Sequence, residues 1–263
     1  MSNINTEALR HIPYYAESIA LTPWHKGYYI DQDGLAWRSV TKPGFDRIEG
    51  YVDLSNAKCH WPDGVNTAGA PMYAYYTKAV FDAGVFSNGR DGKWYGFVGA
   101  FTPTGYAWIE SDRHIETDIV YLVVDTIKRD GRAELHYRVY EVFNHGQANE
   151  RKVLLSWTES VEGLTLQKRD MYDGITQMAT IAFHVNNEME IPPLDRNGIK
   201  LSGMRFFDTV AYDIDGRQHR WDTNILESIH WGRSEHSVHR YENTKEDWSD
   251  VNIDLTFYNI QQA

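Results

Sequence analysis

The most constraining feature of this sequence is a set of turn-forming dipeptides spread along the whole chain. Six are Asp-Gly and two are Asn-Gly, at positions 33–34, 63–64, 88–89, 91–92, 130–131, 173–174, 197–198 and 215–216. Both pairs tolerate the positive φ angles that tight β-hairpin turns require. The stretches between them are short and rich in Val, Ile, Tyr, Trp and Thr, which is the composition of strands. This spacing predicts an antiparallel, all-β protein.

Alternating apolar and polar residues indicate where several strands lie. Residues 115–124 are expected to form a strand whose second half is apolar on both faces, as in a strand buried between two layers. Residues 132–143 alternate cleanly, and residues 153–157 would add the third strand of a meander. Residues 251–257 predict a half-exposed strand near the end of the chain.

The length of 263 residues suits one large β domain, because all-β sandwiches and barrels often reach this size as a single unit. We therefore predict a single all-β domain over residues 1–263. Its expected architecture is an antiparallel two-sheet sandwich, or jelly roll, with a lipocalin-like β-barrel as the alternative. Residues 1–22 are expected to form an N-terminal extension, with one short helical pattern at residues 6–19 that Pro13 interrupts.

Composition excludes several classes of protein and of partner. Aromatic residues make up 14% of the chain, too many for a disordered protein. The formal net charge of −11, without a basic stripe, argues against a nucleic-acid partner. No apolar run approaches the ~20 residues that span a bilayer, so no membrane partner is expected. The expected ligand is a small molecule or a glycan, and the sequence does not indicate an oligomeric state.

The cysteine content and the N-terminal residues bear on location. Cys59 is the single cysteine, so it has no partner for an intramolecular disulfide. The first ten residues are polar and lack the pattern of a signal peptide. The sequence therefore predicts a cytoplasmic protein, or a secreted one if a leader had already been removed.

Two carboxylates in the predicted strand at residues 115–124 are the first candidates for chemistry. Residues two apart on a strand face the same side, so Glu116 and Asp118 would lie side by side. Close carboxylates push each other's pKa values apart, which allows one to act as a nucleophile and another as an acid. The alternative is an exposed strand end where both residues meet water and pair with Arg113 or another base.

A resemblance to a known family covers about 50 residues around this pair. An aromatic segment at residues 73–82 is followed by the Gly-Lys-Trp segment at residues 92–101 and by Glu116-Thr117-Asp118-Ile119-Val120. This order resembles the concanavalin-A-like jelly rolls, in particular the laminarinase-type family 16 glycoside hydrolases. The resemblance implies a two-sheet sandwich with a carbohydrate cleft, in which Glu116 is the nucleophile and Asp118 its supporting carboxylate.

The chain departs from that family at the position of the second catalytic carboxylate. Val120 and Tyr121 stand where the family has its acid/base Glu. A retaining glycosidase needs two carboxyl groups about 5–5.5 Å apart, and a phenol with a pKa near ~10 is a poor proton donor at neutral pH. We therefore expect the acid to come from elsewhere, with Tyr121, His136 or Glu134 completing the chemistry, or the protein to bind without cleaving.

A second set of polar residues lies at positions 132–138. Arg132, Glu134, His136 and Arg138 would project from one strand face. The segment is similar to the Arg-x-Glu-x-Arg strand of jelly-roll alginate lyases, which neutralise a uronate carboxylate with Arg and abstract a proton with His or Tyr. In this chain His136 stands at the position of the second Arg. The alternative is a solvated strand face with cross-strand ion pairs.

The aromatic residues form the third group of candidates. The chain has 9 Trp and 17 Tyr, and many of them crowd into the first 110 residues. Aromatic faces stack on sugar rings and on apolar ligands. We therefore predict that Tyr75, Trp94 and Trp108 contact the substrate together with Arg138, although any one of these rings could instead fill the core.

The sequence predicts neither a metal nor a cofactor at the functional site. His230, His236 and His239, with Glu227 or Glu235, have the right chemistry for zinc or iron but no recognisable ligand spacing. The Asp-x-Asp-Gly segments at residues 31–34 and 213–216 favour hairpin turns, because the distal Glu of a calcium loop is missing. A structural calcium ion stays open as an alternative.

Three functions compete at this point. The leading prediction is a carbohydrate-active jelly roll that binds a polysaccharide in an aromatic groove, as a glycoside hydrolase or a polysaccharide lyase. The alternative is a lipocalin-like barrel that binds, isomerises or cyclises an apolar small molecule, with a Tyr, His or Asp as general acid. The third is a non-catalytic binding module.

Overall fold

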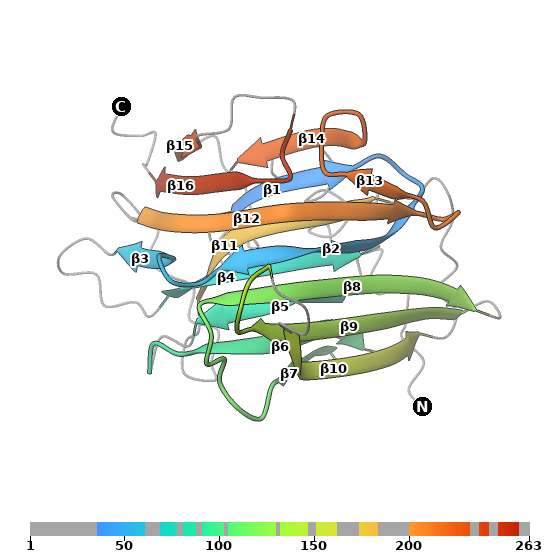
Figure 1. Ribbon diagram of the computed structural model, residues 1–263, viewed down its shortest axis with the longest axis horizontal. Helices are drawn as coiled ribbons and strands as arrows, with labels where there is room; N and C mark the ends of the chain where they lie inside the picture. The colour runs from blue at the N-terminus through green and yellow to red at the C-terminus, as the bar shows by residue number, and fades with distance from the viewer. Residues whose placement is uncertain are drawn as a thin grey trace.

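Every element in the described part of the chain is a β-strand (Figure 1). The structure is a computed structural model that describes residues 36–60, 69–77, 81–87, 91–102, 105–129, 132–146, 151–161, 174–183, 200–231, 237–241 and 247–257. The predicted N-terminal extension and its short helix lie outside these ranges. No described segment forms a helix with the length and apolar character of a membrane span.

The first sheet has seven strands, and its neighbouring strands run antiparallel. In spatial order it contains β14 (Leu226–Trp231), β1 (Ala36–Thr41), β11 (Ile175–Phe183), β4 (Gly69–Thr77), β5 (Phe81–Ser87), β6 (Trp94–Thr102) and β7 (Gly105–Glu110).

The second sheet has nine strands and is also antiparallel. In spatial order it contains β10 (Arg151–Val161), β9 (Arg132–Val142), β8 (Ile119–Arg129), β2 (Phe45–Asp53), β12 (Lys200–Asp213), β16 (Val251–Phe257) and β15 (Ser237–Tyr241). Two short strands, β13 (Gln218–Arg220) and β3 (Lys58–His60), pair with β12 as well.

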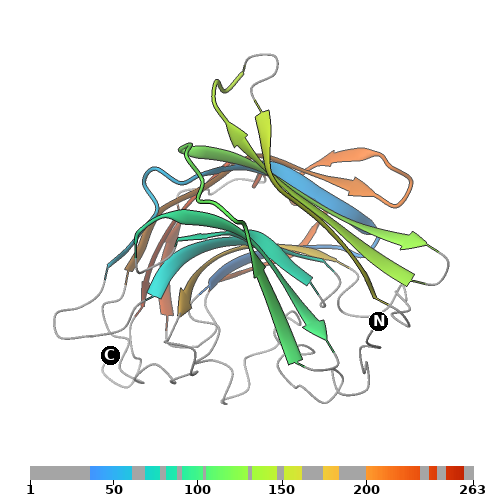
Figure 2. The same cartoon turned by 90° about the horizontal axis from the view of Figure 1, so that it is seen from below.

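The two sheets form curved layers packed face to face (Figure 2). The predicted two-sheet sandwich is therefore confirmed. The lipocalin-like barrel is wrong, because the described strands form two separate sheets rather than one sheet closed on itself. We call the face of the nine-stranded sheet that points away from the other sheet its outer face.

Large apolar side chains from both sheets fill the space between the layers. Trp37 of the seven-stranded sheet packs against Phe206 of β12, with ring centroids 6.1 Å apart, and against Trp248 at 6.2 Å. Phe206 also meets Tyr73 edge to face at 5.1 Å. These rings are almost completely buried. Burial of each stabilises the fold by about 1.5–3 kcal/mol before entropy is counted, so the core accounts for much of the aromatic content.

A chain of buried polar groups also connects the two sheets. Ser39 of β1 donates to Gln177 Oε1 at 3.2 Å, and Gln177 Nε2 donates to Thr209 Oγ1 of β12 at 3.0 Å. Trp221 Nε1 donates to the hydroxyl of Ser39 at 2.9 Å. Burying a polar group without a hydrogen-bond partner is unfavourable for folding, so these hydrogen bonds hold Thr209 in its position between the sheets.

The strands predicted in the second half of the chain are confirmed: β16 has the predicted bounds, while the ends of β9 and β10 are shifted. The pairing of Arg129 with Arg132 closes the hairpin of β8 and β9 at the predicted Asp-Gly turn. The prediction of a strand beginning at residue 115 is wrong, because β8 begins at Ile119. Residues 111–118 instead cross from one sheet to the other.

Backbone hydrogen bonds fix this crossover to both layers. The N–H of Ile115 donates to the carbonyl of Trp94 in the seven-stranded sheet, at 2.7 Å. The carbonyl of Asp118 accepts from the N–H of Leu54 beside the nine-stranded sheet, also at 2.7 Å. Ile115 is buried between the layers while its neighbour Glu116 is exposed. This burial explains why the crossover has an alternating pattern like that of a strand.

Candidate functional site

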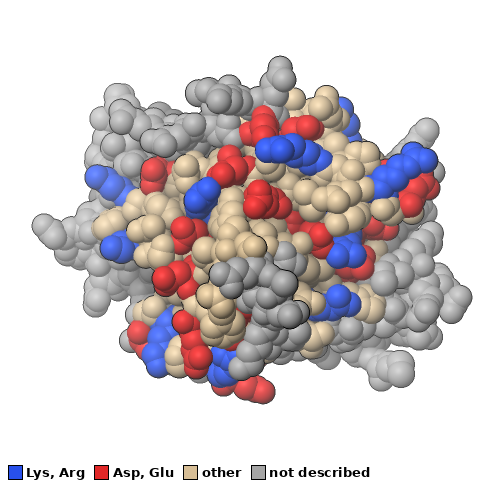
Figure 3. All heavy atoms as spheres, in the orientation of Figure 1, with Lys and Arg blue, Asp and Glu red and all other residues tan. Residues whose placement is uncertain are grey.

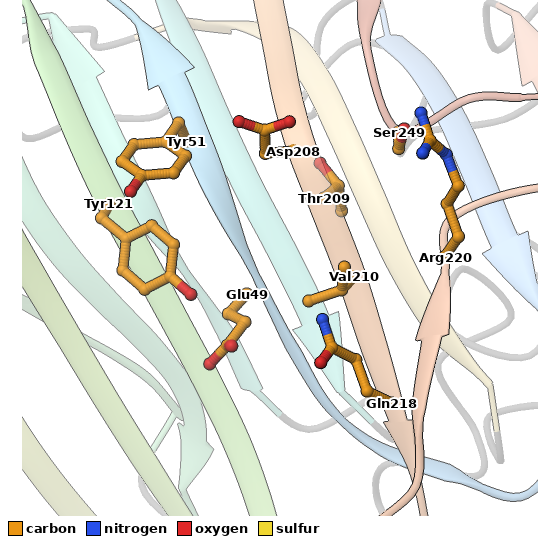
Figure 4. Close-up of a pocket in the computed structure, with 9 residues that line it drawn as sticks. All are labelled: Glu49, Tyr51, Tyr121, Asp208, Thr209, Val210, Gln218, Arg220 and Ser249. Carbon is orange, nitrogen blue, oxygen red and sulfur yellow. The ribbon is translucent and has the colours of Figure 1, made fainter. Parts of the chain in front are cut away.

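The outer face of the nine-stranded sheet carries interspersed acidic and basic side chains (Figure 3). A pocket of about 220 Å³ lies on this face. It is built from three neighbouring strands, β8, β2 and β12, together with β13 and the segment before β16 (Figure 4). The residues that line it are Glu49, Tyr51, Tyr121, Asp208, Thr209, Val210, Gln218, Arg220 and Ser249.

Strand alternation and register place the first wall of the pocket. Glu49 and Tyr51 are two residues apart on β2 and so share a face. Tyr51 is directly paired with Tyr121 of β8. Gly50 lies between Glu49 and Tyr51 and pairs with Leu122 of β8. Both residues are buried, and Leu122 belongs to the core between the sheets.

A β-bulge in β12 shapes the opposite side. The pairing of β12 with β2 shifts between Phe207 and Val210, which leaves Asp208 and Thr209 outside the regular ladder. Asp208 has a φ of 51°, a left-handed conformation that Asp tolerates better than most residues. Thr209 is completely buried, and its N–H donates to the carbonyl of Ser249 at 3.0 Å. The bulge therefore directs Thr209 into the core and leaves Asp208 exposed at the pocket.

Glu49 is a carboxylate with fixed partners. Arg47 donates to it through Nε at 3.2 Å and through a second guanidinium nitrogen, and the Tyr212 hydroxyl donates at 2.7 Å. The Arg47 guanidinium also lies 4.7 Å from the centre of the Tyr212 ring. Burial, and then the adjacent Glu49 carboxylate, raise the pKa of Tyr212, which keeps its phenol protonated as a donor.

The tyrosine wall belongs to an aromatic cluster on the same face. The Tyr51 ring stacks on Phe207 at 5.1 Å and meets Tyr121 at 4.7 Å and His145 at 4.7 Å. Tyr121 also contacts Tyr140 of β9, at 6.3 Å. Such ring pairs stabilise each other by about 0.5–1.5 kcal/mol beyond their buried area, so the wall is held rigidly.

The far side of the pocket carries an ion pair. Arg220 of β13 lies 2.5 Å from the carboxylate of Asp247. Burial alone would raise the pKa of Asp247, but hydrogen bonds from Arg220 and Ser249 outweigh it and lower the pKa to about 2. Ser249 donates its hydroxyl to Asp247 at 2.7 Å. These contacts hold β13 and the segment before β16 together beside the pocket.

Tyr121, a predicted catalytic residue, lines this pocket, and two other predicted site residues lie on the same outer face: His136, predicted to be catalytic, and Arg138, predicted to bind substrate. His136 of β9 is paired with Asp125 of β8, and Arg138 is exposed two residues further along β9. Burial raises the pKa of Asp125, and the nearby charges of Arg47, His136 and Arg138 oppose this shift. His136 and Arg138 thus share a sheet face with Tyr121, but they are not among the residues that line the pocket. The side chain of Glu134 lies outside the described residues.

Glu116 and Asp118 are not brought to the pocket. Both are exposed in the crossover, so the prediction that they lie side by side on a mid-sheet strand is wrong. The buried carboxylate in this region is Glu141 of β9, which is fully inaccessible to solvent. Arg113 donates to both Glu141 oxygens, one of them at 3.0 Å, and the N–H of Glu116 donates at 2.8 Å. Glu141 therefore anchors the crossover from inside.

The aromatic residues predicted to bind substrate lie elsewhere. Tyr75 is fully buried in the core, where burial raises its pKa, so its position does not support contact with a ligand. Trp94 is half-buried and packs on Tyr73 at 5.8 Å. Trp108 is paired with Gly99 in the seven-stranded sheet, and its side chain lies outside the described residues.

No group of three or more His, Cys, Asp or Glu side chains suited to a metal occurs among the described residues. His236 and Glu235 lie outside these residues, as do Asp31 and Asp33 and the side chains of His230 and His239. Asp213 accepts the backbone N–H groups of Asp215 and Arg217 and contacts His219 at 2.8 Å, as the hairpin-turn interpretation expects. Burial raises the pKa of the Cys59 thiol to about 12, so it is a poor nucleophile.

Apart from Tyr121, the lining residues were not among the sequence candidates, and Glu49 and Asp208 illustrate why. Glu49 lies in a strand that the sequence analysis did not single out, although Ile48, Gly50 and Val52 alternate with polar and aromatic residues. Asp208 depends on a bulge, and the Phe-Phe-Asp-Thr segment carries no turn dipeptide that would reveal one. The position of Asp208 therefore follows from pairing across the sheet.

Comparisons with known proteins give the following similarities. No protein-family model and no curated protein sequence matches this chain. Among solved structures, it is similar to scytalidoglutamic peptidase in complex with a peptide-based transition-state analogue, at 11% identity and a TM-score of 0.43, covering 86% of this chain and 98% of the peptidase. It is also similar to a functionally unknown protein from Saccharomyces cerevisiae, at 9% identity and a TM-score of 0.27, covering 56% of this chain and 74% of that one.

Proposed function

We propose that the protein binds carbohydrate in the outer-face pocket. The observation that supports this most is an apolar wall, made by Tyr51 and Tyr121, together with polar side chains in one hollow (Figure 4). Sugars present apolar C–H faces and hydroxyl groups on one ring, so they suit sites where aromatic and hydrogen-bonding side chains meet.

The polar lining matches a polyhydroxylated ligand. A sugar hydroxyl both donates and accepts, and the pocket offers the acceptor Glu49, the donor Arg220 and the amide of Gln218, which does both. A wholly apolar ligand would remove water from these groups without replacing their hydrogen bonds, which is unfavourable. The lining therefore favours a sugar over the apolar small molecule of the alternative prediction.

The volume of the pocket limits the size of ligand that it can hold. Its volume of about 220 Å³ is smaller than most small-molecule pockets, which span about 300–1,000 Å³. This volume suits one sugar ring better than a run of several. We therefore propose that the pocket holds a single sugar unit, either a free monosaccharide or one residue of a longer chain.

Cleavage of the bound sugar, by hydrolysis or elimination, stays a prediction from the sequence. Glu116 and Asp118, to which the resemblance assigns the chemistry, do not line the pocket. His136 and Arg138 would have to act from the neighbouring strand β9. The proposed function is accordingly binding, and turnover is tested together with it.

The test is a titration of the protein with a panel of monosaccharides and short oligosaccharides, monitored by saturation-transfer NMR. Glu49→Gln keeps the shape of the side chain but removes its charge, so we expect at least tenfold weaker binding. Glu227→Gln alters an exposed carboxylate on the other sheet and is the matched control.

Two outcomes would contradict the proposal: no binding by any member of the panel, or equal binding by the native protein and Glu49→Gln. Glu116→Gln is measured alongside for both binding and glycoside cleavage. If the native protein cleaves a glycoside and Glu116→Gln does not, the catalytic prediction for Glu116 gains support despite its position.

A further inference from the structure

We infer that the pocket selects a sugar that carries a protonated amine over a neutral or an acidic sugar. This inference rests on the proposed function, because it names the class of carbohydrate that the same pocket takes. Its basis is the balance of charge among the described residues that form the pocket.

Two of the three charged lining residues have direct partners of opposite charge. Glu49 is paired with Arg47, which contacts it through two guanidinium nitrogens. Arg220 is paired with Asp247 at 2.5 Å. Each pair is close to neutral as seen by a ligand, so neither gives the pocket a strong preference for a cation or an anion.

Asp208 is the third charged residue, and its charge is not balanced in this way. The guanidinium groups of Arg205 and Arg220 interact electrostatically with Asp208 but form no ion pair with it. Arg205 forms its ion pair with Asp250 at 2.9 Å, and Arg220 forms its own with Asp247. Within the described residues, Asp208 therefore presents a carboxylate to the pocket that no direct ion pair neutralises.

The bulge keeps this carboxylate at the pocket. Next to it, Thr209 accepts a hydrogen bond from Gln177 in the core, and its carbonyl accepts the N–H of Trp221 at 3.3 Å. A Cβ atom placed on Gly50 would lie 2.9 Å from Thr209 Oγ1, which shows how tightly the two strands approach here. These contacts hold the bulge in place at Thr209 and so keep the backbone of Asp208 beside the pocket.

The surroundings also favour a cation. Tyr51 and Tyr121 contribute phenol rings, whose faces and oxygens carry partial negative charge and attract ammonium groups. The whole chain has a formal net charge of −11, which attracts cations and repels anions at longer range. A uronic acid would place its carboxylate beside Asp208, and the described guanidinium group that lines the pocket, that of Arg220, is already paired with Asp247.

The expected selectivity is modest because Asp208 is exposed. Attraction between opposite charges about 4 Å apart in water corresponds to a roughly fivefold change in affinity. Salt screens such pairs, so the preference should shrink as the ionic strength rises. An effect of this size is measurable by titration.

The experiment compares D-glucosamine, D-glucose and D-glucuronate at a mildly acidic pH, at which the amine is protonated, by NMR titration of the native protein. We expect D-glucosamine to bind about fivefold more tightly than D-glucose, with D-glucuronate the weakest. Asp208→Asn removes the charge and keeps a residue that tolerates the left-handed backbone. In this variant the preference for the amine over the neutral sugar should fall well below fivefold, because only the weaker attraction of the surroundings is left.

Two further variants keep the test interpretable. Asp208→Gly accepts the positive φ without strain and should give the same loss of preference if Asp208→Asn is poorly folded. Asp215→Asn removes an exposed carboxylate from the hairpin turn between β12 and β13, and should leave the fivefold preference intact.

The outcomes separate this inference from the proposed function. Equal binding of D-glucosamine and D-glucose by the native protein would overturn the inference and leave carbohydrate binding in place. An undiminished fivefold preference in Asp208→Asn and in Asp208→Gly would also overturn it. If none of the three sugars bound the folded protein, both the inference and the single-sugar form of the proposed function would fail.

Discussion

The crossover at residues 111–118 and the bulge at residues 207–210 both carry exposed carboxylates beside the nine-stranded sheet. They differ in the buried residue that holds them in place, which is charged in the crossover and neutral in the bulge. In the crossover, the buried anchor is itself a carboxylate, Glu141, and it binds Arg113 and the backbone of Glu116. In the bulge, the buried anchor is the neutral Thr209, and the charge lies on its exposed neighbour Asp208.

This difference shows which carboxylates are available to a ligand. The Glu141 carboxylate is not available to a ligand, because its oxygens already accept hydrogen bonds within the protein and its side chain has no contact with solvent. The bulge is held by hydrogen bonds of Thr209, and within the described residues Asp208 forms no direct ion pair at the pocket. The four predictions below test this contrast, from the largest expected effect to the smallest.

The first prediction is that Glu141→Ala strongly destabilises the protein. The substitution leaves the Arg113 guanidinium and the N–H of Glu116 without their acceptor, and we expect a loss of about 3 kcal/mol in the free energy of unfolding. Urea denaturation measures it. The exposed Glu116→Gln should change stability by less than about 0.5 kcal/mol. Equal effects of the two variants would show that Glu141 is no anchor.

The second prediction concerns the anchor of the bulge. Thr209→Val keeps the shape of the side chain but removes the acceptor of the Gln177 amide, so we expect a loss of about 1–2 kcal/mol in stability. Because the bulge also positions Asp208, sugar binding should weaken at the same time. Thr209→Ser retains the hydroxyl and should bind sugar like the native protein. If Thr209→Val bound sugar normally, the bulge would not depend on this hydrogen bond.

The third prediction is that the left-handed backbone at Asp208 has a measurable cost. Asp208→Ala should be about 1 kcal/mol less stable than Asp208→Gly, because Ala has a Cβ that clashes in this conformation and Gly does not. Thermal or urea unfolding of the two variants gives the difference directly. Equal stabilities would mean that the backbone relaxes when the side chain is removed.

The fourth and smallest effect concerns the pH dependence of the Arg220–Asp247 pair. The folded-state pKa of Asp247, about 2, lies below the unfolded-state value of about 3.9. The ionised carboxylate therefore stabilises the fold above a pH of about 4, and this contribution is lost as the pH falls through about 2. Since the Asp247 side chain is 41% exposed, we expect less than about 1 kcal/mol.

Asp247→Asn should remove that contribution, so the stability of the variant should fall less steeply than that of the native protein over the same acidic range. Unfolding by urea at a series of pH values measures both slopes. Parallel curves for the two proteins would contradict the assignment of the low pKa to Asp247.

The sequence was sufficient for the fold class because turns and alternation are local. The Asp-Gly turns and the alternation at residues 132–143 reflect which side chains face the core, and β9 has the predicted faces. The error at residues 115–118 has the same origin, since a crossover with Ile115 buried and Glu116 exposed alternates as a strand does.

The candidate site was harder to predict because it depends on pairing between distant segments. Tyr121 could be singled out from its neighbours in the sequence, but Glu49 and Asp208 meet it only through the register of β2 with β8 and with β12. The aromatic residues illustrate the same limit: Tyr75 and Tyr51 look alike in the sequence, yet one lies in the core and the other lines the pocket.

The most direct test of the account is a map of backbone amide shifts in the NMR spectrum of the native protein as D-glucosamine is added. The account predicts that the perturbed amides cluster at residues 49–51, 121, 208–210 and 218–220, around the pocket. Perturbations concentrated at residues 113–118, with the pocket unaffected, would instead place the ligand at the crossover and contradict the central claim.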